Sequence, residues 1–228
     1  MSDRSPDPTI RSRRLAPFIV LAGLTATVLL ALSTTGVLSA FNAGITNTAN
    51  SIGAGTLLMS EKQGATTCLS SSGATISTTN AGTCATINKF NGTTTAVPGT
   101  PITSTVVITN TGTLPARTFT LTPSTCSAAA TGTPAGAGSA SFCSVVNVTI
   151  NNDTAGTCVF PAAATPCAAP GTGTLAGLAT GGVLNLPVPV APAASVTFTF
   201  TVMVSPTAAT NDHQGLTASQ NLTWSFVS

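Results

Sequence analysis

The chain has 228 residues, of which 7 are Lys or Arg and 5 are Asp or Glu, so charged residues make up 5% of it; an average soluble protein has about 25%. Beyond residue 40 three basic and three acidic side chains cancel. This balance excludes a nucleic-acid-binding protein, which needs a basic surface, and a charge-rich disordered chain. The length allows a sizeable core, and a domain without net charge has little electrostatic protection against self-association.

The first 39 residues have the pattern of an export signal. Arginines 11, 13 and 14 precede an apolar run over residues 15–32, and small residues follow this run. A basic, an apolar and a small-residue region in that order predict a secretory signal peptide. The apolar run is also long enough to cross a bilayer, so an uncleaved membrane anchor is the alternative.

The cleavage site is expected among the small residues. Val37 and Ser39 suit the −3 and −1 positions, which predicts cleavage between Ser39 and Ala40. Cleavage after Ala40 is the second choice because it places the bulkier Leu38 at −3. The predicted organisation is therefore a signal peptide over residues 1–39, an N-terminal segment over 40–52 and one domain over 53–228.

All six cysteines lie beyond the export segment. An even number of cysteines in an exported domain indicates disulfide bonds, although six cysteines allow fifteen pairings and the sequence does not choose among them. A zinc site is disfavoured because the chain has no Cys-x-x-Cys motif and its only histidine is His213. The simplest pairing joins neighbours along the chain, as Cys68–Cys84, Cys126–Cys143 and Cys158–Cys167.

Apolar and polar side chains alternate with a period of two after residue 40. The clearest case is residues 196–204, where Val196, Phe198, Phe200 and Val202 alternate with threonines. Such alternation predicts a strand with one apolar face. Further strands are expected at residues 102–108, 118–122, 146–150, 184–188 and 222–226, with weaker candidates at 56–60 and 86–90.

About eight short strands separated by Gly, Pro and Asn turns predict an all-β fold, a jelly-roll-like antiparallel β-sandwich. Pro187 and Pro189 place the 184–188 strand at a sheet edge. Residues 127–141 and 162–182 lack periodicity, and we expect both to be surface loops tethered by cysteines. The expected core residues are Ile108, Val146, Phe198, Phe200, Trp224 and Phe226.

Three sequence blocks follow one another in a specific order: residues 40–45 (AFNAGI) with 54–57 (AGTL), 98–100 (PGT) with 106–116 (VVITNTGTLPA), and 211–218 (NDHQGLTA) with 222–224 (LTW). Together they resemble the mature start, the proline–glycine turn with its strand, and the closing block of the TasA/camelysin family, which are exported proteins of Gram-positive bacteria. His213 departs from the pattern, because family members usually have an aromatic residue there, often Tyr. The cysteine-bearing loops are outside the resemblance.

The resemblance implies a jelly-roll sandwich, cleavage by a SipW-type signal peptidase and a role at the cell surface or in a biofilm matrix. Some family members polymerise by donor-strand complementation, in which the N-terminus of one subunit pairs with the next. Residues 40–52 suit that role because they carry no charge and could add to an open sheet edge. A frayed terminus is the alternative. The candidate assembly residues are Ala40, Phe41, Asn42, Ile45 and Ile52.

The expected partners follow from this hypothesis. Further copies of the chain would form a head-to-tail polymer, since such a contact need not close on itself. The signal peptidase would act on the export segment, and the membrane would be contacted only before that cleavage. Once cleaved, the protein would hold to the cell through accessory matrix or anchor proteins.

Camelysin-like members have been described as metalloproteases, but this chain offers few groups for catalysis. A zinc hydrolase needs about three protein ligands and a base, whereas this chain has His213 and three widely spaced carboxylates after residue 40. A Ser-His-Asp triad would have to use His213 with the adjacent, poorly placed Asp212. The oxygen-rich residues 151–154 are better explained by an Asx turn than by a calcium site.

We therefore expect no catalytic, metal or cofactor site, and an exported structural subunit as the function. The second hypothesis is a monomeric surface adhesin whose cysteine-tethered loops bind a partner. The third is a secreted metallopeptidase.

Overall fold

The computed structural model describes residues 20, 22–29, 45–71, 75–77, 79–162, 167 and 173–228. The chain divides into two compact units, Met1–Ile52 and Gly53–Ser228. In the first unit residues 22–29 are helical, and the hydroxyl of Thr27 donates to main-chain carbonyls of the preceding turn. Within the described part of the chain, every helix falls short of the length and apolar character that a membrane span requires. The expected cleavage site at Ser39 and Ala40 lies outside the described residues.

The second unit contains a larger antiparallel sheet with the strand order β2-β1-β3-β9-β6-β7. The long strands β3 and β9 pair at its centre, where apolar side chains alternate with threonines and serines as the sequence predicts. The strands are β1 (Met59–Gln63), β2 (Thr66–Leu69), β3 (Ile102–Asn110), β6 (Val146–Asn152), β7 (Thr157–Phe160) and β9 (Ser195–Val204).

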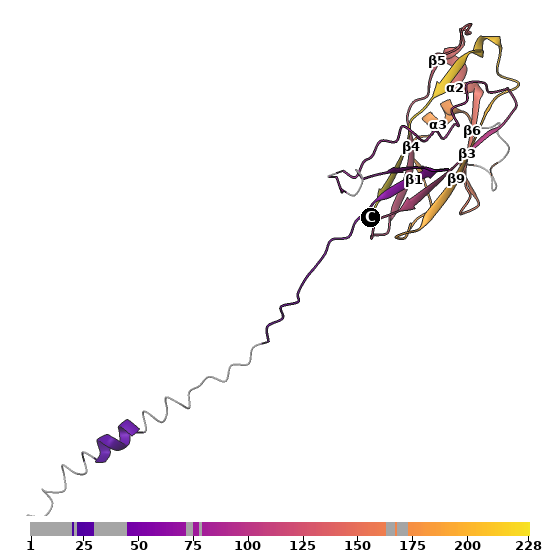
Figure 1. Cartoon of the computed structure of the whole chain (residues 1–228). Coiled ribbons are helices and arrows are strands. Elements are labelled where there is room, and N and C mark those ends of the chain that lie inside the picture. Colours follow the sequence, from indigo (N-terminus) through magenta and orange to yellow (C-terminus); the bar gives the residue numbers. More distant parts are fainter. Residues whose placement is uncertain are drawn as a thin grey trace, which may run out of the picture. The chain divides into compact units, whose positions relative to one another are not determined.

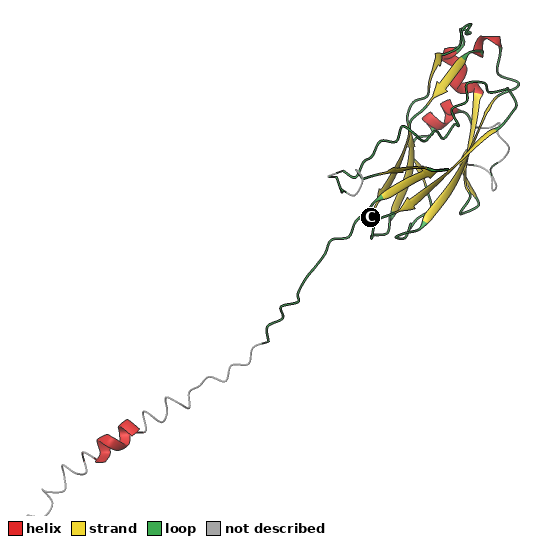
Figure 2. Cartoon of the chain, viewed as in Figure 1, coloured by secondary structure: helices red, strands yellow, loops and turns green. Residues whose placement is uncertain are grey.

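Two smaller sheets complete the strands of this unit (Figures 1 and 2). One has the order β11-β4-β8, from β11 (Leu222–Val227), β4 (Thr118–Pro123) and β8 (Leu184–Asn185). The other pairs β10 (Leu216–Ser219) with β5 (Ser127–Ala130). The helical elements are α2 (Ser139–Val145), α3 (Leu175–Thr180) and the short 3-10 helix η1 (Asn211–His213). Helix α2 lies beside β5 at one end of the domain, the upper end in Figure 1, and α3 lies next to α2.

The core lies between the large sheet and the β11-β4-β8 sheet. Phe198 of β9 packs against Phe119 of β4 with ring centroids 5.8 Å apart and against Trp224 of β11 at 4.9 Å. Of the six core residues expected from the sequence, Ile108, Val146, Phe198 and Phe200 are buried, and Trp224 and Phe226 are partly buried against them. Two antiparallel layers with an apolar interior confirm an all-β sandwich.

Most of the predicted strands are present, and the exceptions have local causes. Residues 184–188 form a strand of two residues at the sheet edge, because Pro187 and Pro189 lack the N–H that a longer ladder requires. The weak candidate at 56–60 begins later, at Met59. The candidate at 86–90 is wrong: Asn88 Oδ1 accepts from the Phe90 N–H at 3.0 Å, which makes a turn instead of a strand.

The expectation that residues 127–141 and 162–182 are surface loops is also wrong in part. The first stretch contains β5 and the start of α2, and the second contains α3. Both helices bury apolar side chains, Phe142 and Val145 from α2 and Leu175 and Leu178 from α3. With 7 and 6 residues they are too short to show a helical period, so tertiary packing determines them.

One buried side chain at the start of the turn after β3 joins this turn to the segment that precedes β9. Asn110 is fully buried, and its Nδ2 donates to the carbonyls of Leu114 at 2.8 Å and Val190 at 2.9 Å. Its Oδ1 accepts from the N–H of Gly112 at 3.0 Å. A β-carbon on Gly112 would overlap main-chain atoms of residues 56–58, so this close approach requires glycine.

Candidate functional site

The N-terminal segment is fully exposed where the structure describes it. Residues 45–52 have no regular secondary structure, and both Ile45 and Ile52 are 101% exposed. Ala40, Phe41 and Asn42 lie outside the described residues. Two branched apolar side chains without a packing partner in an uncharged segment favour association with another surface.

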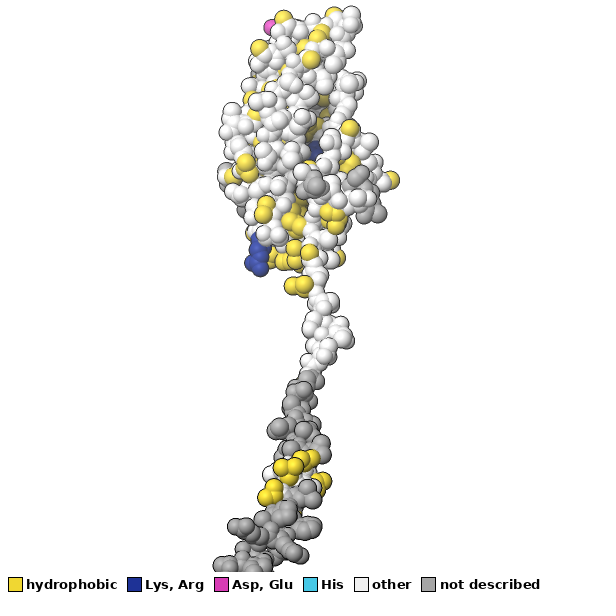
Figure 3. All heavy atoms as spheres, turned by 90° about the vertical axis from the view of Figure 1, so that its left-hand side faces the viewer, with side chains coloured by type: hydrophobic (Ala, Val, Ile, Leu, Met, Phe, Trp, Pro, Cys, Tyr) yellow, Lys and Arg dark blue, Asp and Glu magenta, His cyan; other side chains and the backbone are white. Residues whose placement is uncertain are grey.

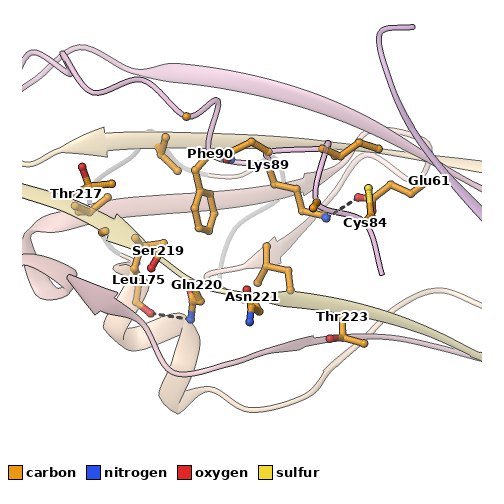
Figure 4. Close-up of a pocket in the computed structure, with 18 of the residues that line it drawn as sticks. Glu61, Cys84, Lys89, Phe90, Leu175, Thr217, Ser219, Gln220, Asn221 and Thr223 are labelled. Atoms are coloured by element: carbon orange, nitrogen blue, oxygen red, sulfur yellow. Dashed lines mark hydrogen bonds and ion pairs between the residues drawn. The ribbon is translucent and has the colours of Figure 1, made fainter. Parts of the chain in front are cut away.

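A cleft of about 1270 Å³ lies along one side of the second unit. One wall is a strap, residues 79–98, that connects the β2 region to β3 and carries Lys89 and Phe90. The opposite wall is the C-terminal part of the chain, where every residue from His213 to Phe226 lines the cleft. Figure 4 shows the strap on one side and Thr217, Ser219, Gln220, Asn221 and Thr223 on the other, with Phe90 between them.

One edge of β10 and β11 is unpaired within the described residues, where β10 pairs with β5 alone and β11 with β4 alone. The Ser124 N–H donates to the Asn221 carbonyl at 2.8 Å, and the Thr131 N–H donates to the Gly215 carbonyl at 2.9 Å. In an antiparallel ladder every second residue pair exchanges main-chain hydrogen bonds. The N–H and carbonyl groups of the odd-numbered residues therefore face β4 or β5. The main-chain groups of the even-numbered residues face the open edge: Leu216, Ala218, Leu222, Trp224 and Phe226.

A charged cluster of Glu61, Lys89 and Trp224 joins three parts of the chain at the cleft. The Lys89 Nζ lies 2.7 Å from Glu61 Oε1, and the two side chains are only 11% and 9% exposed. The same Oε1 accepts from Trp224 Nε1 at 3.0 Å, and Lys89 Nζ lies 5.9 Å from the centre of the Trp224 ring. The two charges compensate each other, so the cluster fixes the strap to both sheets and adds no net charge to the cleft.

Two polar side chains in the cleft have unused acceptors. Of the buried side-chain atoms in the described residues, only Asn80 Oδ1, Asn151 Oδ1 and Gln220 Oε1 lack a hydrogen-bond partner. Asn80 and Gln220 both line the cleft. Gln220 is held in place by its Nε2, which donates to the carbonyls of Ser124 at 2.8 Å and Leu175 at 3.3 Å. Buried acceptors without a partner are uncommon and suit a ligand that brings N–H or O–H donors.

The six cysteines form three disulfides, and each joins neighbours along the chain as the simplest pairing predicts: Cys68–Cys84, Cys126–Cys143 and Cys158–Cys167. The first ties the strap to β2 beside the cleft, and the second ties α2 to the segment before β5. Three disulfides are typical of proteins in oxidising, extracellular-type compartments. The face of the molecule in Figure 3 carries few charged groups among its uncharged surface.

His213 serves as a cap and is poorly arranged to act as a base. Its Nδ1 accepts from the N–H of Thr210 at 3.0 Å, so in the neutral ring Nε2 carries the proton. Nε2 then donates to Ser141 Oγ at 2.9 Å and has no lone pair with which to take the serine proton. The sequence-predicted turn at Asp212-His213 is the short helix η1.

Residues 151–154 form a turn between β6 and β7. Asn152 Oδ1 accepts from the Ala155 N–H at 3.0 Å, which is the expected Asx turn. Both Asp153 carboxylate oxygens accept hydrogen bonds, one from Asn151 and one from Thr199. In the described residues no group of three or more His, Cys, Asp or Glu side chains is close enough to hold a metal ion.

Sequence reasoning missed the cleft. Its polar wall combines the short strand β10, the connecting residues Gln220 and Asn221 and the start of β11, and β10 has too few residues to show alternation. Its charged pair joins Glu61 and Lys89, which lie 28 positions apart and belong to no motif. The signal that was available is indirect: Glu61 and Lys89 are two of only six charged residues after position 40, and opposite charges so scarce tend to be paired when they are buried.

Comparisons of the sequence with models of protein families and with curated proteins find no match.

Proposed function

We propose that this protein is an exported structural subunit of a cell-surface fibre or biofilm matrix, with a jelly-roll domain and an N-terminal assembly strand. The observation that carries the proposal is the exposed segment 45–52, in which Ile45 and Ile52 are 101% exposed, while the described core residues all belong to the second unit. The resemblance of residues 40–57, 98–116 and 211–224 to the TasA/camelysin family supports the same role. Three disulfides are typical of an extracellular protein, which supports export.

Signal cleavage between Ser39 and Ala40 would act as the switch for assembly. Before cleavage the segment is held at the membrane by the apolar run, and afterwards residues 40–52 are free to pair with the next subunit. The contact joins two different surfaces, so it propagates into a fibre instead of closing as a dimer. The charged side chains beyond residue 40 cancel, so they offer little repulsion between subunits.

The experiment compares two forms of the oxidised protein by sedimentation velocity: the chain from Ala40 to Ser228 and the same chain without residues 41–45. Loss of Phe41 and Ile45 should leave a folded monomer that does not elongate, with an unchanged near-UV circular dichroism spectrum. Polymers of equal size from both forms would remove the donor-strand mechanism. Monomers from both forms would favour the adhesin hypothesis.

A further inference from the structure

We infer that the cleft beside β10 and β11 is the acceptor for the assembly strand, and that its occupant is residues 40–52 of a second copy of this chain. This inference rests on the proposed function and adds the identity of the receiving surface. It predicts that the incoming segment becomes an additional strand on the open edge of residues 216–226.

The open edge provides the main-chain groups for such a strand. The N–H and carbonyl groups of the even-numbered residues from Leu216 to Phe226 point away from β4 and β5, and the whole stretch lines the cleft. A peptide that pairs with an open edge gains hydrogen bonds along its length and places alternate side chains in the groove. Gln220 and Asn221 connect β10 to β11. The Oε1 atom of Gln220 has no hydrogen-bond partner, so it offers one more acceptor to the incoming strand.

The length and the side-chain pattern of the segment fit this edge. Residues 216–226 span about 36 Å and residues 40–52 about 43 Å at roughly 3.3 Å per residue, so the segment reaches along the whole edge. Phe41, Ala43 and Ile45 would share one face of an extended strand and point toward the cleft. There the apolar lining includes Phe90 and Leu222.

The charges also fit. Residues 40–52 carry no charged side chain. The charged residues that line the cleft, Glu61 and Lys89, are paired with each other at 2.7 Å. Apart from the new α-amino group at Ala40, the segment therefore enters without bringing a charge into the cleft, whereas a charged side chain would have to lose its hydration without gaining a partner.

Other strand edges are less suited to this occupant. The outer edge of β2 passes close to the strap near Gly82, where a β-carbon would overlap the main chain of Leu69. The edge strand β8 has only two residues. The β10–β11 edge lines the cleft along its whole length, whereas the edge strand β2 contributes only Cys68 and Leu69 to the lining.

The test uses the domain 53–228, which contains the whole described core and all three disulfides and forms a compact unit of its own. A synthetic peptide with the sequence of residues 40–52 is added, and amide exchange is followed by NMR. The amides of residues 216, 218, 222, 224 and 226 should exchange at least tenfold more slowly, while odd-numbered amides of these strands change little. The fluorescence of Trp224, the single tryptophan, should change on binding because this residue lines the cleft.

Two proline variants of the domain provide a matched pair. Ala218→Pro removes an N–H that faces the open edge and that β5 does not use, so peptide affinity should fall at least tenfold. Thr67→Pro makes the same change at an exposed position on the outer edge of β2 and should bind like the unchanged domain. Circular dichroism verifies that both variants are folded.

A peptide in which Phe41 and Ile45 are both replaced by serine should bind at least tenfold more weakly.

The outcomes separate this inference from the proposed function. Binding that protects β2 or β7 amides, or that Ala218→Pro leaves intact, overturns the acceptor and retains donor-strand assembly. Absence of binding together with normal fibres from the chain that begins at Ala40 also overturns the acceptor. Absence of both binding and fibres overturns the proposed function as well.

Discussion

Glu61 accepts a hydrogen bond from the indole of Trp224 at 3.0 Å, across 163 positions of the sequence. Lys89 completes the contact from the strap, at 2.7 Å from the same carboxylate oxygen. This arrangement connects β1 of the large sheet, β11 of the small sheet and the strap at the cleft. Two of the six charged residues beyond position 40 thus hold the walls of the cleft in place.

Lys89→Met should destabilise the domain by about 3–5 kcal/mol, because it leaves the Glu61 carboxylate buried without its countercharge. Urea unfolding followed by circular dichroism measures the loss. The control is Lys62→Met, which changes an exposed lysine on the same strand as Glu61 and should alter stability by no more than about 0.5 kcal/mol. Equal losses from the two variants would show that the buried pair has no special role.

Asn110→Ala should cost about 2–4 kcal/mol, since it leaves the carbonyls of Leu114 and Val190 and the N–H of Gly112 without their partner. Thermal unfolding by calorimetry gives the change. Thr111→Ala is the neighbouring control, because that side chain is exposed. A loss below about 1 kcal/mol for Asn110→Ala would mean that water or a rearranged turn replaces the amide.

Replacing Cys126 and Cys143 together by serine should lower the unfolding free energy by about 3 kcal/mol, because the bridge restricts the unfolded chain over a separation of 17 residues. Chemical denaturation measures this loss. Peptide mass spectrometry of the variant should find the Cys68–Cys84 and Cys158–Cys167 bridges intact. An unchanged unfolding free energy would argue that this bridge is absent from the purified protein.

His213→Ala should destabilise the domain by about 1 kcal/mol, as expected for loss of the cap on the Thr210 N–H. It should have no effect on peptide hydrolysis, since the Nε2 atom that faces Ser141 is poorly arranged to act as a base. A fluorogenic peptide mixture tests both the purified protein and the variant. Hydrolysis by the purified protein that disappears in the variant, or on addition of a chelator, would restore the peptidase hypothesis.

The sequence predicts the sheet architecture better than the site. Alternation at Val196, Phe198, Phe200 and Val202 identifies β9, because a half-buried strand imposes a period of two on its side chains. Helix α3 could not be predicted, because its six residues, which are rich in Ala and Gly, are too few to show a helical period of apolar side chains. Its conformation depends on the burial of Leu175 and Leu178. The cleft depends on contacts between distant residues, such as Glu61 with Trp224, and no local pattern encodes those.

The most direct test of the central claim is negative-stain electron microscopy of the oxidised chain from Ala40 to Ser228 at rising concentration, beside the domain 53–228. Assembly through the N-terminal segment predicts filaments from the longer chain and dispersed particles from the domain. It also predicts that the domain, added in excess, shortens the filaments, because it offers an acceptor without a donor strand. Filaments from the domain alone, or none from the longer chain at any concentration, would contradict assembly by this segment.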